Sequence, residues 1–373
     1  MQDAFEAALA RWGDDPPANP GAWIFSTARN RAIDRLRRDR TLARKTELLA
    51  RLQELEVTVE ERGALPDERL ELIFACCHPA LDTEVRIPLA LRLVCGLTTA
   101  EIARAFLVPE PTLAQRLVRA KRKIRTAGIP LRVPPEHLLP ERLTSALAVL
   151  YLTFNEGYSA ASGDSLVRPE LCDEAIRLAK LLTALMPDEA EVLGLLALML
   201  LQDSRRAARS GPDGELVLLD DQDRSLWDRE RIDEGRRILE RALSLRRSGR
   251  YQLQAAIAAL HAEDAPGATD WQQIAALYGE LARVAPSPVV ELNRAVAVAM
   301  AGAPDDALTL LDRIEGLDEY HLLHATRADL LRRVGRDDEA RAAYARAAGL
   351  ARNAAERTFL ERRLAAVSGV AGS

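Results

Sequence analysis

The stretch TTAEIARAFLVPEPTLAQRLVRAKRKIR, residues 98–125, decides how this chain folds. Apolar residues recur at helical spacing up to Phe106, and residues 107–109 then interrupt the pattern. A second helix begins near Glu110, where Pro111 is tolerated because the first turn of a helix has no partner for its missing N–H group. A threonine at the start of the stretch can cap the first helix. The sequence therefore predicts two helices joined by a short turn.

The two sides of the second helix carry different chemistry. Its apolar side consists of Leu113, Leu117, Ala120 and Ile124. Its polar side consists of Thr112, Gln115, Arg116, Arg119, Arg122 and Lys123. Residues 113–125 contain six Lys or Arg and no acid. Because base edges in the major groove accept hydrogen bonds from Arg and Gln, and phosphates attract positive charge, we favour a helix-turn-helix that binds DNA over a merely solvated basic face.

Length and composition indicate a helical protein with two or three domains. The chain has 373 residues, of which 48 % are hydrophobic and only 4 % aromatic, and few segments show the alternation typical of strands. We therefore expect an all-α fold. No run of 18 apolar residues and no signal segment is present, so we expect a soluble, cytoplasmic protein without a membrane partner.

The four cysteines do not form a recognisable framework. Cys76, Cys77, Cys95 and Cys172 lack the CxxC spacing of zinc sites and the paired spacing of disulfides. The run Cys76-Cys77-His78 could suggest a metal site, but adjacent side chains on a helix point about 100° apart. We interpret these cysteines as small buried residues and predict no metal.

A second basic helix precedes the first one. Residues 20–38, PGAWIFSTARNRAIDRLRR, have helical periodicity, and residues 29–45 contain eight basic and two acidic residues. Charge is therefore unevenly distributed along the chain. Residues 1–130 carry a net charge of +3 and residues 131–373 a net charge of −8, so the front of the chain is the part that we expect to bind a polyanion.

Composition also divides the chain into five parts. Acidic residues around Gly63 and Pro66 predict a flexible linker, and four prolines between Pro130 and Pro140 predict a domain boundary. The expected parts are residues 1–46, an acidic linker at 47–68, the helix-turn-helix part at 69–128, a Pro-rich linker at 129–140 and a repeat domain at 141–373.

The C-terminal part shows helical pairs. AGAPDDALTLLDRI aligns with VGRDDEARAAYARA so that Gly302 matches Gly335 and Ala307 matches Ala340, both 33 residues later. This spacing is close to the tetratricopeptide period of ~34 residues. The Asp-Asp pair in each unit can cap the second helix of its pair. Stacked pairs of this kind form a concave surface, on which we expect a protein partner to bind.

Polar loops in this part do not indicate catalysis. Glu156 and the cluster Asp220–Asp223 could hold a cation, but capping and hydrogen bonds between helices explain such residues better. No nucleophile motif or phosphate loop accompanies them. We therefore predict a protein that is not an enzyme and has no catalytic residues and no cofactor.

With these motifs the chain resembles a known family. Residues 1–128 are similar to bacterial sigma-70 family sigma factors of the extracytoplasmic-function (ECF) class: residues 20–38 look like regions 2.3 and 2.4, and residues 98–125 look like region 4.2. Five further runs resemble the group with a long tetratricopeptide-like extension. These runs are LIFACCHPAL, YLTFNEGYSA, DQDRSLWD, YQLQAAIAALHA and PSPVVELNRAVAVA.

The resemblance implies binding to core RNA polymerase and transcription initiation at specific promoters. Region 4 is expected to bind the minus-35 element through Thr112, Gln115, Arg116, Arg119 and Lys123. Region 2 is expected to bind the minus-10 element through Asn30, Arg31, Asp34, Arg37 and Arg38. Contact with core polymerase is expected from Asp3, Phe5 and Glu6, the remnant of a shortened region 2. Either the start codon has been placed too late, which we favour, or the protein is a truncated factor that binds core polymerase weakly.

Two further expectations concern the chain as a whole. The repeats are expected to fold against the front half as a regulator, and deletion of residues 141–373 is expected to leave residues 1–128 folded. The alternative to a sigma factor is a one-component transcription regulator that binds DNA through its helix-turn-helix and senses a ligand or protein with its repeats. Co-purification with polymerase distinguishes the two.

Overall fold

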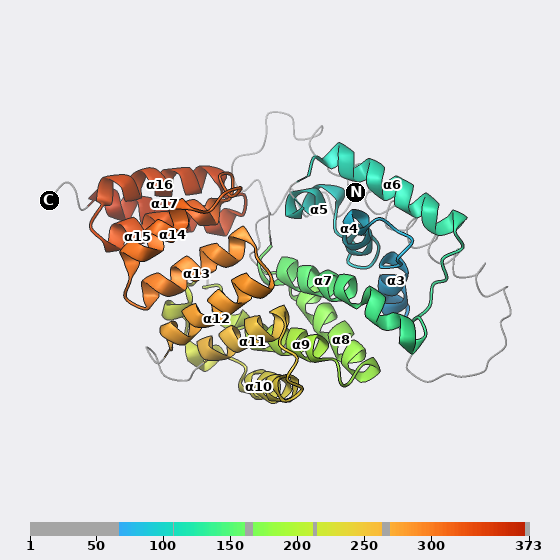
Figure 1. Cartoon of the computed structure of the whole chain (residues 1–373). Helices are drawn as coiled ribbons and strands as arrows, with labels where there is room; N and C mark the ends of the chain where they lie inside the picture. Colours follow the sequence, from blue (N-terminus) through green and yellow to red (C-terminus); the bar gives the residue numbers. More distant parts are fainter. Residues whose placement is uncertain (1–66, 107, 161–166, 212–214, 263–268, 370–373) are drawn as a thin grey trace, which may run out of the picture. The chain divides into compact units, whose positions relative to one another are not determined.

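The chain divides by its internal contacts into residues 1–65 and a second unit, residues 66–373. Figure 1 shows a computed structural model, which describes residues 67–369 apart from 107, 161–166, 212–214 and 263–268. These described residues lie in the second unit, and they form helices joined by turns with no strand among them. The predicted all-α fold is confirmed.

Four helices form the front of this unit. They are α3 (Glu68–Cys76), α4 (Thr83–Leu93), α5 (Thr99–Ala105) and α6 (Glu110–Thr126). Of the two threonines that could cap α5, Thr98 does so: its Oγ1 accepts a hydrogen bond from the backbone N–H of Glu101 at 3.1 Å, and the Glu101 carboxylate accepts one from the N–H of Thr98. This capping box fixes the start of the predicted helix-turn-helix.

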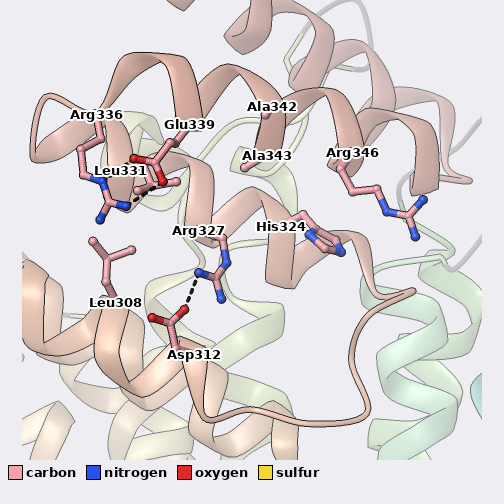
Figure 2. A pocket seen from close by; sticks show the side chains of 10 residues that line it. All are labelled: Leu308, Asp312, His324, Arg327, Leu331, Arg336, Glu339, Ala342, Ala343 and Arg346. Carbon is pink, nitrogen blue, oxygen red and sulfur yellow. Dashed lines mark hydrogen bonds and ion pairs between the residues drawn. The ribbon is translucent and has the colours of Figure 1, made fainter.

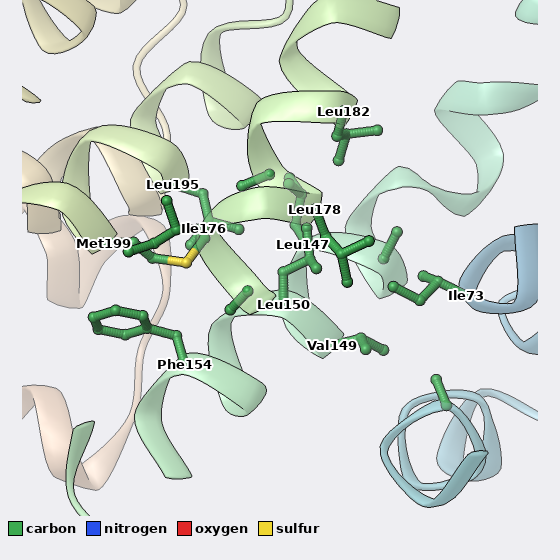
Figure 3. Close-up of a cluster of buried hydrophobic side chains, with 14 of the residues drawn as sticks. Ile73, Leu147, Val149, Leu150, Phe154, Ile176, Leu178, Leu182, Leu195 and Met199 are labelled. Carbon is green, nitrogen blue, oxygen red and sulfur yellow. The ribbon is translucent and has the colours of Figure 1, made fainter. Parts of the chain in front are cut away.

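A large apolar core joins these helices to the next group. That group comprises η1 (Glu136–Leu138), α7 (Leu139–Tyr158), α8 (Pro169–Leu185), α9 (Ala190–Asp203), η2 (Arg206–Ala208), η3 (Leu219–Asp221), η4 (Arg224–Leu226), α10 (Arg229–Ser244), α11 (Arg250–His261) and α12 (Trp271–Val284). One buried cluster runs from Leu70 on α3 to Ala262 after α11. α12 lies outside this cluster, and its buried Ile274 and Leu281 pack in a smaller one with Ile257 of α11. Figure 3 shows Ile73 of α3 in this cluster with Leu147 of α7 and Leu178 of α8.

The Pro-rich stretch at 129–140 does not separate two cores. Ile129 and Pro134 are buried, Leu131 and Val133 pack against the shared cluster, and α7 already begins at Leu139. α6 ends at Thr126, and Gly128 at a φ of +59° follows it, whereas Pro140 lies in the first turn of α7, where proline is tolerated. These residues indicate where one helix ends and the next begins, and here the apolar packing continues across them.

The last helices pack around a separate cluster. They are α13 (Pro288–Met300), α14 (Pro304–Asp312), α15 (His321–Arg333), α16 (Asp337–Leu350) and α17 (Ala354–Gly369). The predicted 33-residue register describes two equivalent helical pairs, α13 with α14 and α15 with α16. Gly302 and Gly335 both have positive φ, +104° and +75°, at the turn inside each pair, and Ala307 and Ala340 are both fully buried. The tetratricopeptide label itself stays a prediction.

The Asp-Asp pairs do not cap the second helices as predicted. Asp305 and Asp306 lie in the first turn of α14, and Asp337 and Asp338 lie in the first turn of α16, but no side chain makes a capping hydrogen bond at either N-cap. The N-cap positions are occupied by Ala303 and Arg336, one or two residues earlier. The carboxylates instead favour the helix starts through the helix dipole.

Cys76 and Cys77 are buried, as predicted, and both are free thiols with no measurable exposure. Burial raises the pKa of Cys76 far above its usual range and that of Cys77 to about 12. Cys95 is half-buried beside Thr153, and burial raises its pKa to about 11. The Cys95 thiol is therefore more accessible and more acidic than those of Cys76 and Cys77.

We predict that neither Cys76 nor Cys77 is alkylated by iodoacetamide at pH 8 while the chain is folded. The thiolate is the reacting species, and a pKa of about 12 leaves only about one Cys77 thiol in 10⁴ ionised at that pH. Mass spectrometry of timed reactions should show Cys95 modified before either of them, and all of them modified in denaturant. Alkylation of Cys77 ahead of Cys95 would contradict the buried assignment.

Candidate nucleic-acid interface

The apolar side of α6 is packed as the sequence predicts. Leu113, Leu117 and Ala120 are at most 5 % exposed, and Ile124 packs against the shared cluster. The turn before α6 is closed by a hydrogen bond of 2.9 Å from the N–H of Val108 to the carbonyl of Ala103. α6 contacts both α4 and α5, so its rotation about its own axis is fixed (Figure 1).

The opposite side of α6 is exposed and cationic. At about 100° per residue, Gln115, Arg119 and Arg122 lie opposite Leu113 and Leu117, and all three polar side chains are exposed. Val118 lies beside them and is 68 % exposed, more than any other large apolar side chain of the described residues. This surface presents hydrogen-bond donors, positive charge and one apolar contact, the three properties with which proteins read base edges.

One flank of this surface is partly neutralised by acids from the start of α4. The Nη1 atom of Arg116 lies 2.9 Å from Oε2 of Glu84, and the Nζ atom of Lys123 lies 3.7 Å from Oδ1 of Asp82. Asp82 occupies the N-cap of α4, yet its carboxylate makes no capping hydrogen bond. The two acids therefore serve the neighbouring cations instead of their own helix.

The five residues predicted for the minus-35 element thus fall into two groups. Thr112, Arg116 and Lys123 border a hollow between α4 and α6, whereas Gln115 lies on the outer side of α6. Arg119 also lies on the outer side, and it reaches the edge of the same hollow. The predicted set left out two residues of the outer side, Arg122 and Val118. Helical spacing alone could have added Arg122. The same spacing places Val118 on the outer side, although its apolar side chain alone would suggest a core position.

The other predicted contacts lie outside the described residues. They are Asn30, Arg31, Asp34, Arg37 and Arg38 for the minus-10 element, and Asp3, Phe5 and Glu6 for core polymerase. These assignments stay predictions.

A second hollow, between α14, α15 and α16, is polar but internally paired (Figure 2). Arg327 forms an ion pair of 2.6 Å with Asp312, and Arg336 forms one of 2.7 Å with Glu339. Nothing in this arrangement indicates a specific ligand. The predicted protein partner of the repeats stays a prediction.

The polar loops of the C-terminal part have structural roles. Asp223 accepts a hydrogen bond of 2.9 Å from the N–H of Ser225 at the start of η4. Glu156 forms an ion pair with Arg168. The described residues contain no group of His, Cys, Asp and Glu side chains arranged to hold a metal ion.

Family comparisons agree with this geometry. Residues 71–124, which span α3 to α6, match Sigma-70, region 4, and residues 1–41 match Sigma-70 region 2. The chain belongs to the sigma-70 family. Residues 142–243 of this sigma-70 family protein match a family of unknown function, DUF6596, which covers α7 to most of α10.

A relative shares nearly the whole length of this sigma-70 family protein. It is an uncharacterized protein of Rhizobium meliloti (strain 1021), 46 % identical over 372 residues, and the match covers 98 % of this chain and 88 % of the relative. The region 2 and region 4 domains together give the protein a role in promoter recognition. Among the described residues, no helix is both long and apolar enough to cross a membrane.

Proposed function

We propose that this protein is a sigma factor of the ECF class that binds core RNA polymerase and directs initiation at specific promoters. The observation that carries the proposal is the outer side of α6, where Gln115, Arg119 and Arg122 stand exposed on a helix whose other side is fixed in the core. Region 4 would bind the minus-35 element through this side. Region 2 would bind the minus-10 element. The activity places the protein in the cytoplasm and involves no catalytic step of its own.

Reconstitution with core polymerase tests this proposal. The full chain should co-elute with core polymerase and direct run-off transcription from promoters selected from a random DNA pool. A chain that binds selected DNA but neither co-elutes with core polymerase nor supports transcription would instead be a one-component regulator. Absence of any selective DNA binding would contradict both functions.

We also propose that the C-terminal helices regulate promoter binding through their junction with α3. Arg177 of α8 forms ion pairs of 2.6 Å with Asp67 and 2.8 Å with Glu174, and Glu174 also pairs with Arg69 at 2.7 Å. Burial works to raise the pKa of Asp67, but the hydrogen bond and charge of Arg177, together with hydrogen bonds from the backbone N–H groups of Leu70 and Arg69, outweigh this and lower the pKa. Further along α3, the carbonyl of Phe74 accepts a hydrogen bond of 3.1 Å from the buried Arg142 of α7. Any movement of α7 or α8 would therefore reach α3.

The acids beside α6 lead to a prediction about non-specific binding. We expect the double variant Glu84→Gln/Asp82→Asn to bind arbitrary duplex DNA more tightly than the wild type at low salt. Arg116 and Lys123 no longer have to leave a carboxylate to approach a phosphate, and two negative charges near the DNA are removed. We expect an affinity gain of about 2- to 10-fold and a steeper salt dependence, by up to about 2 in the slope of log K against log[salt].

Fluorescence anisotropy across a series of salt concentrations measures both quantities. Glu319→Gln is the control. Glu319 is about as exposed as Glu84 and also pairs with an arginine, Arg346, but both residues belong to the C-terminal helices and not to α4 or α6. An unchanged affinity and slope in the double variant would show that the acids do not compete with DNA.

A further inference from the structure

Arg205, just after α9, is a buried arginine that pairs with no acid in the described part of the chain. Its side chain is 9 % exposed, its Nε atom has no hydrogen-bond partner, and it forms no ion pair with the described residues. The next residue behaves differently: Arg206 pairs with Asp173 and Asp203, both at 2.6 Å. Buried charges in proteins are normally paired, because removal of a charge from water is costly. The missing partner of Arg205 therefore requires an explanation.

The segment around Arg205 is packed against a later loop. The N–H of Asp228 donates to the carbonyl of Ser204 at 2.8 Å, and the N–H of Val217 donates to the carbonyl of Arg209 at 2.9 Å. Residues 217–228 therefore run alongside residues 204–209. The Cζ atom of Arg205 lies 5.9 Å from the ring centre of Trp227. The Cζ atom of Arg209, which is half-buried, lies 3.8 Å from the ring centre of Tyr158 at the end of α7.

These neighbours also lack hydrogen-bond partners, and most of the unused groups are donors. The unpaired buried atoms here are Nε of Arg205, Nε of Arg209, Nε1 of Trp227, Oη of Tyr158, Oε1 of Gln222 and Nδ1 of His261. The two arginines, Trp227 and Tyr158 can donate, whereas Gln222, Tyr158 and His261 offer the only acceptors among these atoms, and all three are neutral. Among these groups of the described chain, the cluster therefore has two positive charges and no negative charge, which an oxyanion supplies together with acceptors.

The histidine near Arg205, His261, has a lowered pKa. Burial lowers the pKa of His261 to about 4, and the positive charge of Arg205 contributes to this shift. His261 is therefore neutral at physiological pH and does not add to the charge of the cluster. It also cannot supply the missing negative charge.

We propose that Arg205 and Arg209 hold a small oxyanion, either a phosphate or a carboxylate group. The ligand has to be small because Arg205, Gln222, Trp227 and Tyr158 are each at most 9 % exposed, so only the half-buried Arg209 leads to the surface. The site lies in the segment that matches the family of unknown function. Tyr158 ends α7, the helix that packs against α3 and α4, so an anion here would stabilise the body on which the DNA-binding helices rest.

The test measures the melting temperature of the full chain with inorganic phosphate and, separately, with acetate, at an ionic strength held constant with chloride. We expect one of the two anions to raise the melting temperature of the wild type. The variant Arg205→Met should lose this response, with at least a tenfold weaker affinity by calorimetry. Without an added anion the same variant should melt at the same or a higher temperature, because it removes an uncompensated buried charge.

Two further variants keep the test decisive. Arg237→Met, at an exposed arginine on α10, should keep the full anion response. If Arg205→Met does not fold, Arg209→Gln takes its place and should also lose the response. No response of the wild type to either anion beyond chloride would mean that buried waters satisfy the cluster, and the proposal would be wrong. A response that persists in the Arg205 and Arg209 variants would show an adventitious ion only, with the same consequence.

Discussion

Replacement of Arg119 and Arg122 by alanine is expected to weaken binding to the minus-35 element by at least about 30-fold. Both side chains are exposed on the outer side of α6 and neither forms an ion pair with the described residues. A good contact to a base edge contributes ~1–3 kcal/mol, so the loss of two contacts costs roughly 2–6 kcal/mol. The DNA probe is the minus-35 sequence that the wild-type protein selects from a random pool. Anisotropy at about 0.15 M salt measures the affinity.

The control variant removes the same charge elsewhere. Arg237→Ala/Arg241→Ala takes two arginines from α10 and is expected to change the affinity by no more than about twofold, since α10 packs against α9 and α11 and its exposed charges act on DNA at α6 only through screening solvent. Probes that differ by one base pair then separate two roles. A base-reading residue relaxes specificity at one position, whereas a phosphate contact weakens every probe equally.

Arg116→Ala should cost less than Arg119→Ala. Arg116 forms an ion pair with Glu84 at 2.9 Å and has to break it before it can bind DNA. The free energy lost with this ion pair reduces the net contribution of Arg116 to binding. If Arg116→Ala proves the more damaging change, Glu84 orients Arg116 toward a base instead of competing with the DNA. The relative size of the two effects therefore tests the division of the interface into an outer side and a flank.

The sequence predicted the local features of this interface well. Periodicity placed Leu113 and Leu117 inside and Gln115 and Arg119 outside, because a helix repeats every 3.6 residues whatever surrounds it. The capping box at Thr98 is likewise a local pattern that can be read without a structure.

Features that depend on distant residues could not be predicted. Glu84 lies 32 positions before Arg116, and no local rule pairs them. The unpaired Arg205 is equally hidden, because an arginine in a sequence is expected to be solvated and only its surroundings show that it is not. The prolines before α7 were interpreted as a domain boundary, since proline reports where a helix ends and says nothing about what packs behind it.

Removal of residues 141–373 is expected to unfold α3 to α6, contrary to what the Pro-rich stretch suggested. Ile73 and Phe74 of α3 have no exposed surface, and the cluster that buries them includes Leu147 of α7 (Figure 3). Exposure of two such side chains costs about 3–6 kcal/mol. A domain of about 60 residues buries too little surface to absorb that loss, since whole domains are stable by only about 5–15 kcal/mol. Circular dichroism of residues 1–140 should show reduced helicity and no cooperative thermal transition.

A shorter deletion provides the control. Residues 1–286 lack α13 to α17, whose apolar cluster is separate from the one that contains α3. This fragment should keep a cooperative transition, although its α12 loses contact with α13. A cooperative melt of residues 1–140 with full helicity would instead show that the region 4 helices fold alone, as the sequence first suggested.

The expected unfolding also decides how regulation by the C-terminal helices has to be measured. If a deletion of the C-terminal helices lowers promoter binding, the unfolding of α6 already explains the loss, and the result says nothing about regulation. Arg177→Ala avoids this difficulty, because it removes the exposed ion pairs to Asp67 and Glu174 and leaves the apolar junction intact. Surface ion pairs contribute only about 0–1 kcal/mol, so this variant should stay folded. If it binds the selected minus-35 DNA and initiates transcription with unchanged strength, these ion pairs do not carry regulation from α8 to α3.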